Sequence, residues 1–128
     1  MKTLINIVLF SFILLCFSCT SKQSDSDSIT LEQLEAKKTA IENYINSFSC
    51  SESLGCNYIA FGSKPCGGPR KYLVFSNTIN LPQLQNMVTE YNEMDHLRNV
   101  QTNAVSDCSV PLPPNEIGCV NGVCTIIN

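Results

Sequence analysis

The residues best suited to chemistry lie in the stretch KPCGGPRK, between Lys64 and Lys71. It carries three basic side chains, Lys64, Arg70 and Lys71, within eight residues. Gly67 and Gly68 lie between them and can adopt positive φ, so their backbone N–H groups can form a nest for an anion. This pattern predicts a loop that binds a carboxylate, a phosphate or an acidic protein partner. The alternative is a stapled turn whose cations only keep the surface soluble.

Residues for catalysis are scarce. His96 is the only histidine, and a Cys–His pair would also need a free thiol. Glu90 and Glu93 are one helical turn apart, as a carboxylate pair could be, but such pairs usually lie on a solvated helix face. The chain has no G-x-S-x-G, P-loop or H-E-x-x-H motif. We therefore expect no catalytic residue, no metal and no cofactor.

The cysteines indicate disulfides. Their even number after residue 28, the lack of a C-x-x-C pair and the single histidine argue against a tetrahedral zinc site. Small exported domains keep disulfides because their compartment is oxidising and their cores are limited. We predict three disulfides among Cys50, Cys56, Cys66, Cys108, Cys119 and Cys124.

The last two cysteines flank a hairpin. Asn-Gly at positions 121–122 predicts a type I′ turn, which places Cys119 opposite Cys124. A direct Cys119–Cys124 disulfide is then within reach. Alternatively, both side chains point to the same face of the hairpin and each bridges to another element.

The other four cysteines have three possible pairings. An extended strand from Cys56 would force Cys66 to double back before the two could meet. We therefore predict the pairs Cys66–Cys108 and Cys50–Cys56.

The N-terminus has the layout of an export signal: a basic start, an apolar run from Leu4 to Phe17, and a small residue, Ser18. The run is short for a membrane span, which needs about 20 residues. CFSC, residues 16–19, resembles the lipobox of bacterial lipoproteins, although Cys16 stands where an aliphatic residue is usual. The resemblance implies cleavage after Ser18 and lipidation of Cys19, whose acyl chains would hold the protein at a membrane. The alternatives are an ordinary signal peptide or a short uncleaved anchor.

The next segment, TSKQSDSDS, has no apolar residue and cannot contribute to a core, so we expect a flexible tether. The predicted organisation is a signal peptide at 1–18, a lipidated tether at 19–28 and one domain at 29–128.

Loss of Lys2 with the signal leaves seven basic and eleven acidic residues, a formal charge of −4 that disfavours nucleic acid as a partner. We expect the outer membrane, on its periplasmic or surface face, with the membrane itself and an acidic protein or small anion as partners.

The domain shows alternating helix and strand patterns. A helix is predicted over 29–48, with Thr30 and Gln33 as a capping box and Lys37 and Lys38 on its solvent side. Strands are predicted over 56–62 and 70–77, and a second helix from Leu81 to Val100. An extended segment and the hairpin follow. This order predicts an α+β class: two helices packed on a small, mostly antiparallel sheet in a single disulfide-stapled domain.

The stretch KPCGGPRKYLVFS, followed by EYN, SDC and the late hairpin, resembles a group of small exported cysteine-rich bacterial proteins. The resemblance covers roughly Cys56 to Cys124 and implies a single stapled domain without implying an activity. In that group an aromatic residue is usual where Arg70 stands, so the positive charge is particular to this chain.

These observations predict a lipid-anchored envelope or surface protein of non-enzymatic binding type that uses the loop around Cys66. One alternative is an inhibitor of an extracellular enzyme that presents the same loop, because a preorganised loop lowers the cost of binding. A second alternative is a small hydrolase without a recognised motif.

Overall fold

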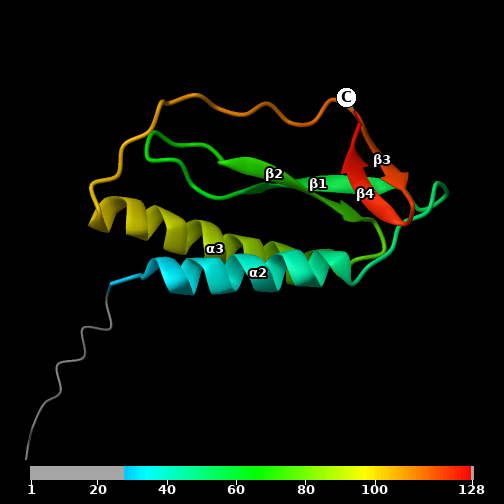
Figure 1. Ribbon diagram of the computed structural model, residues 1–128, viewed down its shortest axis with the longest axis horizontal. Coiled ribbons are helices and arrows are strands. Elements are labelled where there is room, and N and C mark those ends of the chain that lie inside the picture. The colour runs from blue at the N-terminus through cyan, green and yellow to red at the C-terminus, as the bar shows by residue number, and fades with distance from the viewer. Residues whose placement is uncertain (1–27, 128) are drawn as a thin grey trace, which may run out of the picture.

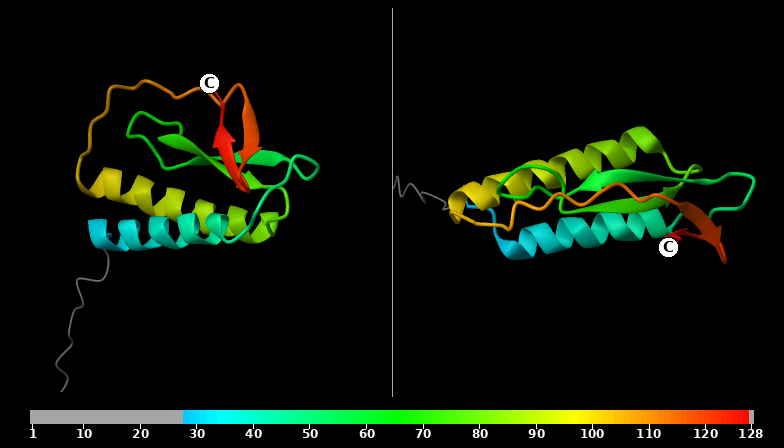
Figure 2. Two further views of the ribbon diagram at one scale, coloured as in Figure 1. Left: turned by 45° about the vertical axis from the view of Figure 1, so that its right-hand side comes forward. Right: turned by 90° about the horizontal axis from the view of Figure 1, so that it is seen from above.

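The computed structural model describes residues 28–127. Its elements are α2 (Leu31–Asn46), β1 (Cys56–Phe61), β2 (Lys71–Ser76), α3 (Leu81–Gln101), β3 (Ile117–Val120) and β4 (Val123–Ile126). The two helices lie side by side as one layer, the β1–β2 hairpin covers them, and the β3–β4 hairpin packs at one end (Figures 1 and 2). The predicted signal peptide, the lipidation site Cys19 and nearly all of the tether lie outside the described residues. Between residues 28 and 127, no helix is long and apolar enough to cross a membrane.

Both helices begin where side-chain capping predicts. At α2, the Thr30 Oγ1 accepts a hydrogen bond from the Gln33 N–H at 3.2 Å, and the Gln33 Oε1 accepts one from the Thr30 N–H at 2.8 Å. At α3, the Asn80 side chain accepts from the Gln83 N–H at 3.2 Å. A proline follows in the first turn of α3, where no backbone donor is needed. These caps satisfy N–H groups that a helix start leaves without partners.

The β1–β2 hairpin is antiparallel, and its inner face is apolar. Strand alternation directs Ile59, Phe61, Leu73 and Phe75 toward the helices, where the core is completed by Leu34, Ile41, Leu84, Val88 and Tyr91. On the outer face, Tyr58 and Tyr72 pack edge to face with ring centroids 5.5 Å apart. The α+β class is thus confirmed, although the strands form two two-stranded antiparallel sheets, β1–β2 and β3–β4. One disulfide, between Cys56 of β1 and Cys124 of β4, joins these two sheets.

The structure pairs Cys66 with Cys108, as predicted, with their Cα atoms 5.2 Å apart. The other two predicted pairs are wrong. Instead of Cys119–Cys124 and Cys50–Cys56, the structure forms Cys50–Cys119 and Cys56–Cys124, each with Cα atoms 5.8 Å apart.

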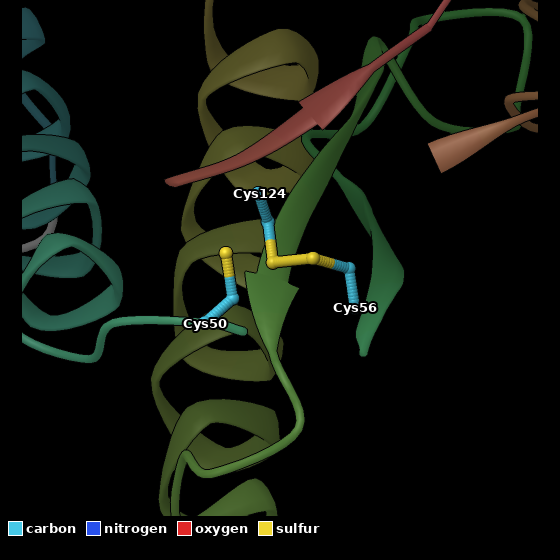
Figure 3. A group of neighbouring side chains, drawn as sticks. All are labelled: Cys50, Cys56 and Cys124. Carbon is cyan, nitrogen blue, oxygen red and sulfur yellow. A yellow bond between two sulfur atoms is a disulfide. The ribbon is translucent and has the colours of Figure 1, made fainter. Parts of the chain in front are cut away.

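The physical reason lies in how the β3–β4 hairpin docks. Cys119 and Cys124 are cross-strand partners, so their side chains share one face of the hairpin. That face packs against the end of the β1–β2 hairpin, and the Cys50 N–H donates to the Gly122 carbonyl at 3.0 Å. Cys119 and Cys124 therefore each bond to a cysteine of another segment. This is the alternative to a direct Cys119–Cys124 bridge. Figure 3 shows Cys124 bonded to Cys56 with the sulfur of Cys50 beside them.

The sulfur atoms of Cys50, Cys56 and Cys124 all lie within 4.8 Å of one another. Such a cluster could suggest a metal centre. All three sulfurs are in disulfides, however, and metals are bound by the free thiolate. The cluster is therefore two neighbouring disulfides that tie the β3–β4 hairpin to β1 and to the loop before it.

Candidate functional site

The turn at the tip of the predicted loop is exposed and uses its own backbone groups. Gly67 and Gly68 have φ of 94° and 80°, as expected for a nest-like turn. The Gly67 N–H donates to the Lys64 carbonyl at 2.9 Å, and the Lys64 N–H donates to the Gly68 carbonyl at 2.9 Å. One of the two glycine donors on which an anion nest would depend is therefore already used within the turn.

Lys64 points away from solvent and secures the segment that carries Cys108. Its Nζ contacts the Asp107 carboxylate at 2.7 Å and also donates to the carbonyl and hydroxyl of Ser109, and its side chain is only 14% exposed. Hydrogen bonds from Lys64 and Ser109 lower the pKa of Asp107 to about 2. Lys64 thus reinforces the Cys66–Cys108 disulfide.

We expect Lys64→Met to raise the pKa of Asp107 from about 2 toward its ordinary value of 3.8. Because the folded pKa is depressed, the contact stabilises the fold above about pH 4 and is lost as pH falls through about 2. A carbon-detected NMR titration of the carboxyl group measures both values. Lys37→Met should leave the Asp107 titration unchanged. An Asp107 that still titrates near pH 2 in the Lys64 variant would contradict the assignment.

Arg70 turns toward α3. Its Nε and Nη2 donate to the two carboxylate oxygens of Asp95 at 2.6 and 3.0 Å, and Nη2 also donates to the Asn99 side chain at 2.9 Å. Asp95 is 5% exposed and accepts a further hydrogen bond from the Ser63 N–H at 2.8 Å. The hydrogen bond with Asp95 raises the pKa of Arg70. This bidentate pair braces the β1–β2 connection against α3.

Lys71 points toward Glu42 of α2. Its Nζ lies 3.2 Å from the Glu42 carboxylate and 5.4 Å from the centroid of the Phe61 ring. Each of the three predicted cations is therefore paired with a carboxylate from a different element. The structure does not bring them together into one exposed basic surface.

A cavity of about 550 Å³ lies between the first half of α2, the second half of α3 and the adjacent end of the β1–β2 hairpin. In Figure 1 this is the end of the domain where α2 begins and α3 finishes. Arg70 and Lys71 contribute to it from the predicted loop. The rest of the lining comes from Leu31, Leu34, Glu35, Lys38, Phe61, Tyr91, Asp95, Arg98, Asn99, Thr102 and Ala104.

The cavity combines positive charge with an aromatic wall. Its lining has four basic and two acidic side chains, a formal charge of +2 in a chain whose total is −3. Phe61 and Tyr91 are buried and stack with ring centroids 4.2 Å apart and an interplanar angle of 16°. Burial, followed by the charge of Asp95, raises the pKa of Tyr91, so its hydroxyl stays protonated at neutral pH.

Arg98 is the distinctive residue of this cavity. Of the six Lys and Arg residues between positions 28 and 127, it alone has no carboxylate within ion-pair distance. Its Nη1 donates to the Ile29 carbonyl at 2.8 Å, which fixes the half-buried side chain. A guanidinium group has five N–H donors, so Arg98 keeps donor capacity that the described protein atoms do not use.

Sequence reasoning missed most of this cavity. Lys38 was expected on the solvent side of its helix, but it lines the cavity and pairs with Glu35 at 3.0 Å. Arg98 was not singled out. A signal did exist for the α3 wall, because Val88, Tyr91, Asp95 and Asn99 recur at helical spacing and extend the apolar stripe into polar residues.

The cavity lining contains no serine, cysteine or histidine. His96 lies outside it, beside Glu93 in a shallower hollow of about 410 Å³ next to Gly68 and Pro69. The predicted site residues are therefore divided between the exposed turn, its ion pairs and the cavity.

Comparisons of the chain with family models, curated proteins and solved structures returned no match.

Proposed function

We propose that this protein is a lipid-anchored, non-enzymatic binding protein of the cell envelope that holds a small molecule in the cavity between α2, α3 and the β1–β2 hairpin. The observation that carries this proposal is Arg98, a half-buried cation that has no carboxylate partner among residues 28–127 and lines the same cavity as a stacked aromatic pair. Only one donor of this guanidinium is used by a carbonyl, so its remaining N–H groups and its charge are available to an anionic group in the cavity. The volume falls within the range of about 300–1,000 Å³ that is usual for small-molecule sites.

The lining favours binding over hydrolysis. Asp95 is the buried carboxylate of the cavity, and its oxygens are occupied by Arg70 and the Ser63 N–H. The Thr102 hydroxyl donates to the Arg98 carbonyl at 2.9 Å rather than to a base. A nucleophile activated by a neighbouring base is the usual basis of covalent hydrolysis, and the lining offers no such pair.

Two observations support export and anchoring. The three disulfides suit an oxidising compartment. The cavity lies at the end of the domain where the chain enters α2, because Leu31 is part of its lining. A lipid on Cys19 would be twelve residues before Leu31, so the anchor would be attached at the end of the domain that carries the cavity.

Filling the cavity should abolish binding. We expect Ala104→Trp, whose indole would enter the cavity, to remove every stabilising hit that a panel of small organic compounds gives with wild type. Ala40→Trp is the matched control, since Ala40 is exposed on α2 and does not line the cavity. Thermal unfolding with each compound measures the effect. Hits that survive in the Ala104 variant would contradict the proposed site.

The anchor is tested separately. Cys19→Ser removes the sulfur that would carry the lipid, and we expect the protein to move from the membrane fraction to the soluble fraction. Each buried methylene of an acyl chain contributes about 0.8 kcal/mol, so loss of the chains should release most of the protein. Cys16→Ser serves as the control and should stay with the membrane. Retention of the Cys19 variant at the membrane would sink the lipidation proposal.

A further inference from the structure

We infer that the ligand of this cavity is an organic carboxylate, in which a carboxylate group is attached to an aromatic or aliphatic part. This inference rests on the proposed binding function and specifies its ligand class. Two features of the lining lead to it: the unpaired guanidinium of Arg98, and the apolar surface next to it.

The lining has a formal charge of +2, but Glu42, which lies outside the lining, pairs with Lys71, so one positive charge stays uncompensated and favours an anion with one negative charge. Lys38, Arg70 and Lys71 each have a carboxylate partner, whereas Arg98 has none among residues 28–127. A guanidinium offers parallel N–H donors that match the two oxygens of a carboxylate. One uncompensated cation balances a monoanion, while a phosphate dianion would leave one negative charge without a partner. A cationic ligand is opposed by the net positive lining.

The uncharged part of the cavity lining favours a ligand with an apolar group. Phe61 and Tyr91 form a stacked wall, and Leu34 is buried beside them. Leu31 lies at the start of α2 with 59% of its surface exposed, although it lines the cavity. Phe61, Tyr91 and Leu34 are already buried, so a ring or a short alkyl chain of a ligand would mainly cover the exposed side chain of Leu31 and remove its apolar surface from water. The same ligand would bring its carboxylate to Arg98.

A matched pair of ligands tests the inference. 4-Phenylbutyrate and 4-phenylbutanamide have the same shape and differ in charge. Binding is measured by isothermal titration calorimetry on the full mature chain in lipid nanodiscs, with empty nanodiscs as the blank. We expect the carboxylate to bind roughly tenfold more tightly than the amide, because hydrogen bonds to charged groups are the stronger class.

Three variants test whether Arg98 causes the preference for the carboxylate over the amide. Arg98→Gln should bring the affinity ratio of carboxylate to amide to about one, and Arg98→Lys should keep part of it because the charge remains. Lys37→Gln is the control, since Lys37 is adjacent to Lys38 in sequence but pairs with Glu90 and does not line the cavity. It should keep the full preference. Circular dichroism checks that loss of the Arg98–Ile29 hydrogen bond leaves the helices intact.

A second pair, N-acetylphenylalanine and its amide, presents the carboxylate as a peptide C-terminus would. Tighter binding of this acid than of 4-phenylbutyrate would assign the site to peptide ends, and the reverse order to free organic acids. Equal binding of acid and amide in wild type would overturn the ligand class while the cavity stays a binding site. Failure of all four compounds to bind, or binding that Ala104→Trp leaves unchanged, would overturn the proposed function as well.

Discussion

Removal of the two disulfides that join the β3–β4 hairpin to the rest of the domain is expected to release that hairpin. The bridges Cys50–Cys119 and Cys56–Cys124 close loops of 69 and 68 residues. A disulfide that closes a loop of this length stabilises the folded state by about 4 kcal/mol in the chain-entropy description. The two loops overlap almost completely, so the losses should be less than additive. We expect the quadruple Cys→Ser variant to lose more than either double variant.

Urea unfolding measures the free-energy change, and amide hydrogen exchange shows where protection is lost. In the quadruple variant, residues 117–126 should exchange freely while α2 and α3 keep their protection. The double variant Cys66→Ser/Cys108→Ser is the control: it also removes a long-range bridge, of 42 residues, but should leave the β3–β4 hairpin protected. A hairpin that stays fully protected without its two bridges would show that noncovalent packing is sufficient to hold it.

Among the five ion pairs between residues 28 and 127, loss of the Arg70 side chain is expected to be the most damaging change. Arg70→Met keeps the apolar stem but leaves Asp95, whose side chain is 7% exposed, without its charged partner. Removal of one member of a buried ion pair costs about 3–5 kcal/mol. Arg70 itself is 42% exposed, so water can partly replace it, and we expect a loss of about 3 kcal/mol, at the lower end.

Two comparisons isolate the cause of that loss. Asp95→Asn in the Arg70→Met background should recover part of the stability, because a neutral amide is cheaper to bury than an unpaired carboxylate. Lys37→Met breaks an exposed pair with Glu90 and should change stability by less than about 1 kcal/mol. If Arg70→Met were as mild as Lys37→Met in urea unfolding, the Arg70–Asp95 pair would not be a structural brace.

Local sequence rules predicted the elements of the fold well. The capping box at Thr30, the cap at Asn80 and the Asn-Gly turn each depend on neighbouring residues, and each is present in the structure. The pairing of the cysteines depends on how separate elements dock. A hairpin with Cys119 opposite Cys124 permits a direct bridge, and only its packing against the β1–β2 hairpin directs the two sulfurs elsewhere.

The separation of the three loop cations has a related cause. Lys64, Arg70 and Lys71 are close in sequence, which suggested one basic surface. Arg70 lies just before β2 and Lys71 begins it, and each turns to a different carboxylate although both line the cavity. Their acidic partners come from α3 and α2, at separations that no local pattern reveals. The same packing brings Arg98 of α3 and Phe61 of β1 into the lining of one cavity, although they are far apart in the chain.

The central claim is that the cavity between α2, α3 and the β1–β2 hairpin binds the ligand. Titration of the ¹⁵N-labelled wild-type chain with 4-phenylbutyrate, followed by amide chemical shifts, tests it most directly. We predict that the shifts concentrate on Leu31, Lys38, Tyr91, Arg98 and Thr102, while the exposed turn at 66–68 and the β3–β4 hairpin stay unchanged. Shifts that cluster on residues 66–68, or that scatter over the surface with no maximum at the cavity, would contradict the claim.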